Sequence, residues 1–335
     1  MAPKNNKFNY LSFLFSITLF VLLLELGLSL LNINPIRFLG NINEPTVYEY
    51  DCILGWKAKE GKYTFPKYSL NGDEIKFSFL KDGLRKTSSE QDNIRDTLPK
   101  IVFCGGSFMQ GWGISDHETL PWKIQKELSD YEVLNYATGG YGTYQSLLAL
   151  ECNLPLLDSP KFVFYGFMDH HELRNVAPTL WIKTLNEFSK RNHVSVPYAT
   201  IGQNNKLERS FPESYNYLPF HEYLSSVRLI ERIRDKFFDD DRIDQKTLVT
   251  ERIILQMNKF CRSYGAELVF VILSANNETR THYKEYLENK NIRVIDAHVE
   301  FTDELIVKGD GHPNEKVHSQ WANIILRDLN RIRSK

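Results

Sequence analysis

The longest apolar stretch of the chain lies at its N-terminus. Residues 8–31 carry one charge, Glu25, and roughly 20 apolar residues are enough to cross a bilayer. Lys4 and Lys7 precede the stretch without an acidic neighbour, which favours a cytoplasmic N-terminus and an exported body on the periplasmic or extracellular side. The pattern therefore predicts a single membrane-anchoring helix within residues 1–34. A cleaved signal peptide is the alternative, although signal peptides usually have a shorter apolar core.

From residue 99 to residue 335, short apolar runs alternate with amphipathic segments. The third run, residues 161–167, is almost entirely apolar, as expected of a strand that is buried on both faces of a parallel sheet. This alternation predicts an α/β domain with a mainly parallel, five-stranded sheet and helices on both faces. The predicted strands are 101–104, 132–136, 161–167, 267–273 and 292–296. The predicted helices are 119–128, 143–154, 244–264, 279–289 and 313–332.

Two further segments do not follow this alternation. Residues 40–98 combine aromatic and β-branched residues with glycine-marked turns, which predicts a small β-rich extension. The extension either packs on the main domain, which we favour, or forms a lip on a substrate groove through Trp56 and Tyr63. Residues 176–240 are a polar, proline-containing stretch with one predicted helix at about 222–238, and they are longer than a connection requires. We expect this insertion to be a lid or a partner surface.

Composition and charge narrow the classes of function. The 335 residues include 41 basic and 42 acidic side chains, with no basic stripe that would predict nucleic-acid binding. The four cysteines are scattered and show no CxxC spacing for zinc or a redox pair. His170 and His171 are adjacent, but they lack the His-x3-His spacing of a helical zinc site. We therefore expect no nucleic-acid partner, no metal and no other cofactor.

Candidate chemistry gathers where the predicted strands end. The first strand ends in the Gly-Gly-Ser sequence of residues 105–107, a tight turn that can present a hydroxyl at the carboxyl edge of the sheet. Ser107 is there either a nucleophile or a helix cap. The second strand ends in the glycine-rich residues 139–142, where a backbone N–H can point into a site as an oxyanion-hole donor.

Two later strand ends carry titratable residues. Residues 168–175 follow the third strand and include five charged or histidine side chains, a density that favours a functional site. Asp310 and His312 flank a glycine just before the C-terminal helix. A serine nucleophile needs an imidazole to take its proton and a carboxylate to orient that imidazole. Asp310 and His312 can supply both to Ser107, because the carboxyl ends of parallel strands meet at one edge of the sheet.

These four blocks, in this order, resemble those of the SGNH/GDSL hydrolase superfamily over about residues 100–330. Ser107 stands at the nucleophile position of that family. Gly106 replaces the aspartate of the Gly-Asp-Ser motif, a change common in its polysaccharide-associated branches. Asp310 and His312 match a DxH form of the last block. Such a resemblance implies that His312 deprotonates Ser107 and that Asp310 orients His312.

The two middle blocks match the family less closely. Gly140 falls at the glycine of the second block, with Gly139 as the near alternative. The asparagine of the third block is missing, and His170 stands closest to its place, with Asp169 one residue away. The resemblance implies an oxyanion hole formed by the N–H groups of Ser107 and Gly140 together with His170.

The resemblance also implies a fold and an activity. The fold would be a flavodoxin-like, three-layer α/β/α sandwich, and an acyl-serine would form and pass its acyl group to water or to a sugar hydroxyl. Membrane-tethered members of the family act on acyl groups of envelope or extracellular polysaccharides. We therefore expect a serine esterase that removes acyl groups, with acetyl as the expected group, from an acylated glycan.

Other functions remain open on the sequence. An O-acyltransferase, a lipase or a thioesterase would use the same residues on another acceptor or acyl chain. Outside the enzymes, a catalytically inactive binding or assembly protein for polysaccharide is the alternative. That alternative would be favoured if His170 blocked the site or if Ser107 did not contact His312.

Overall fold

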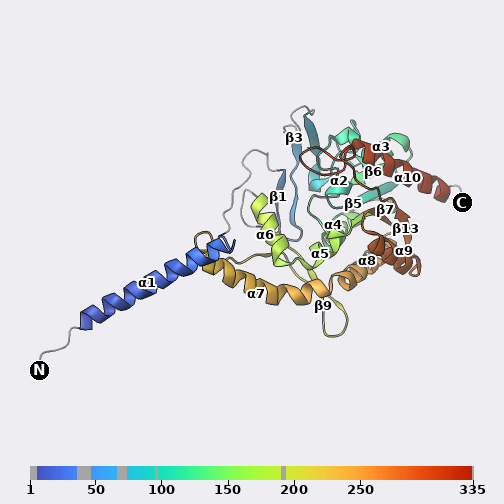
Figure 1. The fold of residues 1–335 in the computed structure, drawn as a ribbon. Helices are drawn as coiled ribbons and strands as arrows, with labels where there is room; N and C mark the ends of the chain where they lie inside the picture. The colour runs from blue at the N-terminus through green and yellow to red at the C-terminus, as the bar shows by residue number, and fades with distance from the viewer. Residues whose placement is uncertain (1–5, 36–46, 66–73, 95–96, 190–193, 334–335) are drawn as a thin grey trace, which may run out of the picture.

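The computed structural model shows an α/β body from which one long N-terminal helix projects (Figure 1). The two ends of the chain lie at opposite extremes of the molecule. The structure describes residues 6–35, 47–65, 74–94, 97–189 and 194–333.

A five-stranded sheet forms the centre of the body. Its order is β13-β12-β7-β5-β6, and every neighbouring pair is parallel. The strands are β5 (Lys100–Gly105), β6 (Glu132–Asn135), β7 (Pro160–Met168), β12 (Glu267–Ser274) and β13 (Arg293–Asp296). Each of the five apolar runs forms one of these strands, so the predicted parallel, five-stranded sheet is confirmed.

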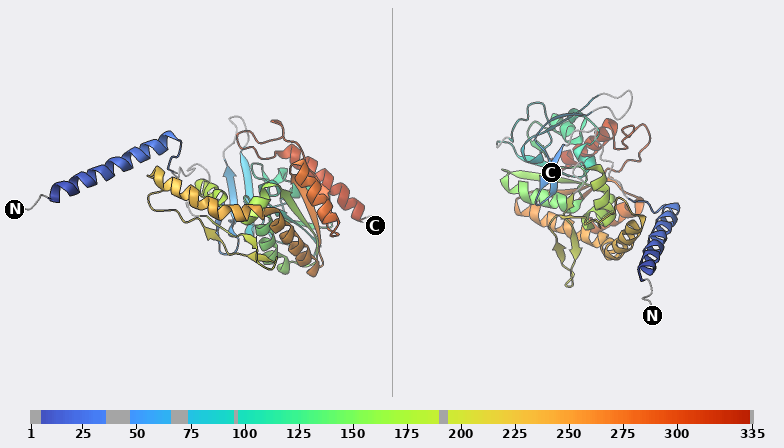
Figure 2. Two further views of the ribbon diagram at one scale, coloured as in Figure 1. Left: turned by 60° about the horizontal axis from the view of Figure 1, so that its bottom comes forward. Right: turned by 90° about the vertical axis from the view of Figure 1, so that its left-hand side faces the viewer.

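Helices cover both faces of the sheet and give the body three layers (Figure 2). Successive side chains of a strand point to opposite faces. Val102 and Phe270 therefore pack under α4, α8 and α9, whereas Phe103 and Val271 pack under α3 and α10. The helices are α3 (Leu120–Glu127), α4 (Thr143–Asn153), α8 (Lys246–Ser263), α9 (Asn277–Glu288) and α10 (Glu315–Arg333). Burial on both faces explains why the strands have continuous apolar sequences.

Two small antiparallel sheets precede the body. The first pairs β1 (Tyr48–Asp51) with β2 (Gly55–Ala58), and the second pairs β3 (Gly61–Phe65) with β4 (Ile75–Phe79). Arg85 connects the second of them to the main sheet, because its backbone bridges Phe79 on one side and Asn135 at the end of β6 on the other. The strands of the extension therefore pack against the main domain.

The insertion at residues 176–240 contains more regular structure than the sequence predicts. It holds the unpredicted helix α6 (Thr179–Phe188), the predicted helix, now α7 (Ser225–Asp244), and four strands of two or three residues: β8 (Ser195–Val196), β9 (Ala199–Ile201), β10 (Leu207–Arg209) and β11 (Glu213–Ser214). Pro178 directly precedes α6. A proline suits that place, because the first amides of a helix have no partner within the helix.

The N-terminal helix α1 (Asn6–Leu30) is mostly free of the body. From Tyr10 to Leu30 it is long and apolar enough to cross a membrane, and 6% of its apolar window is buried. Contact is confined to its C-terminal part, where Leu28 is buried and the helix meets α7. Such a helix suits a membrane anchor or a signal sequence equally, and its retention as an anchor stays a prediction.

Candidate active site

Ser107 lies at the carboxyl end of strand β5, where the chain turns into the short helix α2 (Ser107–Gln110). The turn depends on Gly105, whose φ is +148°; a Cβ there would lie 2.7 Å from the carbonyl oxygen of Gly166 on β7. The neighbouring strand can approach this closely only because residue 105 has no side chain. The turn directs the Ser107 side chain to the sheet edge, where it is buried among neighbouring loops.

The loop between β13 and α10 brings an imidazole and a carboxylate to this serine. His312 Nε2 lies 2.9 Å from Ser107 Oγ, and His312 Nδ1 lies 2.6 Å from Asp310 Oδ2. A carboxylate can only accept, so Nδ1–H donates to Asp310 and Nε2 is left to accept the serine hydroxyl proton. Val307 N–H donates to His312 O at 2.7 Å and holds the loop in this shape. Three residues from two strand ends thus form one hydrogen-bonded chain.

Aromatic packing restrains the imidazole. Phe108, next to the serine, meets the His312 ring edge-on at 5.7 Å between ring centroids. Phe108 in turn contacts Phe301 at 5.6 Å and stacks on the buried Trp321 of α10 at 6.1 Å. Side chains packed in this way lose rotamer freedom, so the ring is held near the serine before any substrate binds.

The second strand end distinguishes the two candidate glycines. Gly139 N–H donates to Gln110 Oε1 at 3.0 Å, and the same oxygen accepts from Tyr48 OH at 2.9 Å. Within the described part of the chain, Gly140 N–H has no such partner. Trp56 covers this loop: its Nε1–H donates to Gly139 O at 3.0 Å, and a Cβ at Gly140 would meet its ring at 3.0 Å.

The two aromatic residues expected to form a lip lie in different surroundings. Trp56 contacts the second strand end, as described above. Tyr63 OH instead lies 3.1 and 3.2 Å from the carbonyl oxygens of Lys59 and Glu60, in the turn just before its own strand β3. The extension therefore reaches the candidate site through Trp56 and Tyr48, and the sequence pattern gives no indication of Tyr48.

The third strand end continues as the helix α5 (His170–Val176). The side chain of His170 is 68% exposed, and its Nδ1 lies 3.0 Å from Asp169 Oδ1. Asp169 Oδ1 also accepts from the His170 backbone N–H at 2.8 Å and so begins the helix. The structure places His170 beside Asp169 and not in contact with Ser107 among the described contacts. Its oxyanion role stays a prediction.

His171 is the histidine that faces the serine turn. It is buried, its Nδ1 lies 2.6 Å from Tyr165 OH, and its Nε2 would lie 2.7 Å from a Cβ placed on Gly106. Burial, with the positive charge of Arg174 adding to it, lowers the pKa of His171 well below its usual range, so the ring is neutral. Tyr141 O and Arg174 Nη1 would approach the same Cβ at 3.0 and 3.2 Å. His171 and Arg174 thus fill the space that a side chain at residue 106 would need.

Arg85 fixes the loop that follows α2. Its fully buried guanidinium donates to Gln110 O at 2.8 Å, to Gly111 O at 2.6 Å and to Ile114 O at 2.7 Å, and it pairs with Asp116 at 2.9 Å. Hydrogen bonds to charged groups are among the stronger ones in proteins. Three of these four partners are backbone carbonyls, which leave no pattern in the sequence, so sequence reasoning does not find Arg85.

Metal and disulfide chemistry have little support in the described residues. Within them, no group of three or more His, Cys, Asp or Glu side chains could hold a metal ion. All four cysteines are free; Cys52 and Cys152 are exposed, and Cys104 and Cys261 are buried.

The chain is similar to several solved structures of other proteins. No family model and no curated protein sequence matches the chain. The chain is similar to the psychrotrophic esterase EstA from a Pseudoalteromonas species (TM-score 0.41, 11% identity, 70% of this chain and 99% of that one). It is also similar to a lipolytic G-D-S-L family protein from Veillonella parvula (TM-score 0.39, 12% identity, 69% and 98%) and to TesA (TM-score 0.39, 14% identity, 69% and 98%).

Proposed function

We propose that this protein is a serine esterase of the carboxylic-ester hydrolase class. The observation that carries the proposal is the hydrogen-bonded chain from Ser107 through His312 to Asp310, with distances of 2.9 and 2.6 Å. Ser107 Oγ attacks the ester carbonyl carbon while its proton moves to His312 Nε2. The alcohol leaves with that proton, an acyl-serine remains, and water activated by the same imidazole releases the acid.

The negative charge on the carbonyl oxygen needs donors at the same edge of the sheet. The N–H groups of Ser107 and Gly140 are the proposed donors, with His170 as the third group taken from the resemblance. Gly139 N–H is bonded to Gln110, whereas Gly140 N–H has no partner among the described residues, which supports the choice of Gly140. A donor preorganised toward the developing charge contributes roughly 3–4 kcal/mol to transition-state stabilisation.

For the substrate we propose acyl esters, acetyl above all, on a carbohydrate or cell-envelope polysaccharide. The exposed apolar helix α1 supports this proposal, because it would hold the body on the outer side of the membrane, where such polymers lie. The 2.9 Å contact between Ser107 and His312 supports an esterase over the alternative of a catalytically inactive protein.

Labelling with a fluorophosphonate tests the serine chemistry. The full chain should be labelled, and Ser107→Ala should abolish labelling. Ser263→Ala, which alters an exposed serine at the end of α8, should label like the unchanged protein. An unlabelled protein, or equal labelling of the Ser107→Ala variant, would remove the covalent-serine proposal.

Substrate class is tested separately, by acetate release from a panel of acetylated glycans and by hydrolysis of p-nitrophenyl esters of increasing chain length. We expect acetate from at least one glycan and highest kcat/KM for the shortest ester. Activity confined to long-chain esters would contradict the glycan proposal while leaving the serine mechanism intact. Transfer of the acetyl group to an added sugar in place of water would convert the assignment to an O-acyltransferase.

A further inference from the structure

The helix α7 is amphipathic in the opposite sense to an ordinary surface helix. A surface helix normally buries its apolar stripe and exposes its charges. In α7 the buried residues are Ser225, Glu231, Asp235 and Asp239, all of them polar. The most exposed large side chains include isoleucines and phenylalanines. The polar residues of α7 are therefore buried and its large apolar residues are exposed.

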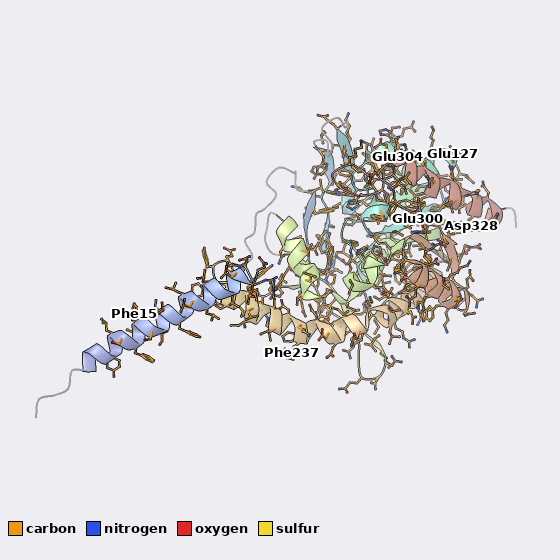
Figure 3. The ribbon with its side chains drawn as sticks, viewed as in Figure 1. Phe15, Glu127, Phe237, Glu300, Glu304 and Asp328 are labelled. Atoms are coloured by element: carbon orange, nitrogen blue, oxygen red, sulfur yellow. The ribbon has the colours of Figure 1, made fainter. Side chains whose placement is uncertain are left out.

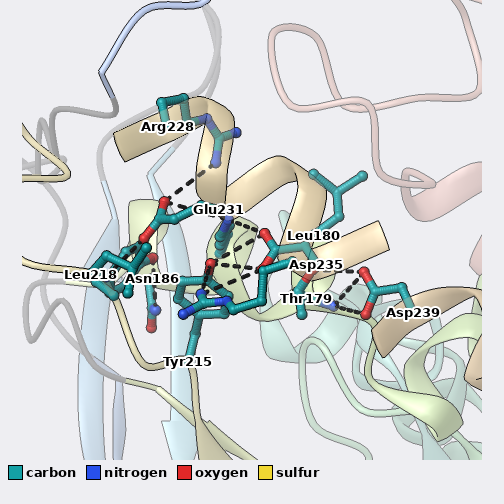
Figure 4. Close-up of polar contacts among 12 residues, drawn as sticks. Thr179, Leu180, Asn186, Tyr215, Leu218, Arg228, Glu231, Asp235 and Asp239 are labelled. Carbon is teal, nitrogen blue, oxygen red and sulfur yellow. Dashed lines mark hydrogen bonds and ion pairs between the residues drawn. The ribbon is translucent and has the colours of Figure 1, made fainter. Parts of the chain in front are cut away.

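The polar face is satisfied by the protein itself (Figure 4). Asp235 bonds to Lys183 of α6 and accepts from Tyr215 OH at 2.8 Å. Asp239 accepts from Thr179 N–H at 2.9 Å, at the start of α6. Carboxylates buried with such partners fix the rotation of α7 about its own axis, because turning it would leave charges unpaired.

The opposite face is therefore held outward. Ile230, Ile233 and Phe237 follow the spacing of three and four residues that places side chains along one side of a helix. They are 55%, 51% and 79% exposed. Figure 3 shows Phe237 on the side of α7 turned away from the body. The turn before the helix adds the exposed aromatic residues Phe220 and Tyr223. We call these five residues the α7 apolar face.

The start of α7 is hydrogen-bonded to the N-terminal helix. Glu25, the only charge within the apolar stretch of α1, accepts from the backbone N–H groups of Ser225 and Ser226 at 2.5 and 3.1 Å. These are first amides of α7, which attract a carboxylate because they lack partners within the helix. Figure 2 shows the start of α7 lying against the C-terminal end of α1. The α7 apolar face thus begins where α1 would leave a bilayer.

We propose that the α7 apolar face rests in the surface of the same lipid bilayer that α1 enters, and so gives the body a second membrane contact. An exposed apolar stripe with aromatic residues is typical of helices that lie in the interface between headgroups and acyl chains. Beyond Phe237 and Phe238 the charges Asp240, Asp241 and Asp244 are exposed or close to the surface, so the last turn leaves the interface for water. The proposal rests on α1 being retained in the membrane and is independent of the ester chemistry.

Spin-label accessibility tests the contact in the full chain. The exposed Cys52 and Cys152 are replaced by serine, and one nitroxide is attached at Phe237→Cys in protein reconstituted into phosphatidylcholine nanodiscs. Leu22→Cys in α1 is the control for lipid, and Leu156→Cys, an exposed leucine in the turn after α4, is the control for water. We expect the ratio of oxygen to nickel-chelate accessibility at residue 237 to exceed that at residue 156 several-fold and to approach that at residue 22.

Each other result overturns the proposal. The label at residue 237 could show the same accessibility ratio as the label at residue 156 while the label at residue 22 is in lipid. In that case α1 anchors the body but the α7 apolar face stays in water. Low accessibility to both reagents with dipolar broadening means that a second copy of the chain covers the face. A residue 22 label in water removes the anchor and the proposal together, without bearing on fluorophosphonate labelling of Ser107.

Discussion

Gly106 shows how a single residue can separate this chain from the family that it resembles. Its Cβ position is surrounded by His171 Nε2 at 2.7 Å, Tyr141 O at 3.0 Å and Arg174 Nη1 at 3.2 Å. Backbone and buried side chains at those distances cannot yield easily. Glycine at residue 106 and the histidine–arginine pair of α5 are therefore complementary features of one site.

Gly106→Asp would restore the Gly-Asp-Ser motif, and we expect it to damage the protein. The new side chain must displace His171, at a cost of about 1–3 kcal/mol typical of overpacked sites. Ester hydrolysis should fall because the turn that carries Ser107 shifts. Thermal unfolding and kcat/KM measure the two effects. A variant as stable and as active as the unchanged protein would show that this space is free.

Asp310 is expected to act through His312. Asp310→Asn should keep the fold but lower kcat by about 10³- to 10⁴-fold, because an amide favours the wrong tautomer of the imidazole. Asp303→Asn, an exposed carboxylate in the same loop, is the matched control and should retain full activity. Equal activity of the two variants would contradict the proposed role of Asp310.

Buried histidines make stability depend on pH. Burial, with the charges of Arg85 and Lys123 adding to it, lowers the pKa of His318 to about 3. The unfolded chain binds a proton at this residue below about pH 6.5, whereas the folded protein does not until about pH 3. The unfolding free energy should therefore fall as the pH drops from 6.5 toward 3, by up to about 1.4 kcal/mol per pH unit from this residue.

Denaturant unfolding at pH 7.5 and at pH 5 measures this dependence. His318→Asn should reduce the difference between the two pH values, because asparagine can accept the Leu120 N–H as His318 Nδ1 does, at 3.0 Å, and does not titrate. His117→Asn, at an exposed histidine, should leave the difference unchanged. An identical pH dependence in the His318→Asn variant would show that this ring takes up its proton without unfolding.

At the scale of elements, Arg85 joins the β-rich extension to the loop behind the serine. Arg85→Met should lower the unfolding free energy by about 3–5 kcal/mol, because it leaves Asp116 without its charge partner and three buried carbonyls without donors. Lys81→Met, in the exposed turn before it, should change stability little. Denaturant unfolding measures the stability of both variants. Equal stability of Arg85→Met and Lys81→Met would contradict this role and mean that water replaces the guanidinium.

The elements that the sequence predicts best are those whose burial is uniform. Residues 162–167 are buried on both faces, so their apolar run identifies β7 directly. The helix α6 lies in a polar, proline-containing stretch and is not predicted, although Pro178 just before it is compatible with a helix start. At the third strand end, polar residues 169–175 form α5, and the phase of that helix decides that His171, and not His170, faces Gly106. No local pattern specifies that phase.

At the scale of the whole molecule, the order of strand ends predicts how Ser107, Asp310 and His312 come together. Parallel strands place their carboxyl ends at one edge, so residues about 200 apart in sequence can meet there. The contribution of Arg85 and Tyr48 could not be predicted, because it depends on contacts between the extension and the body. The same holds for α7, whose carboxylates Asp235 and Asp239 are buried against α6.

The central claim is that Ser107 is a nucleophile activated by His312. Its most direct test is peptide mass spectrometry of the fluorophosphonate adduct, with the unchanged chain and His312→Gln compared under the same conditions. The account predicts one adduct, on Ser107, and its loss in the His312→Gln variant at unchanged fold. An adduct on another residue, or an equal yield on Ser107 without the imidazole, would contradict it.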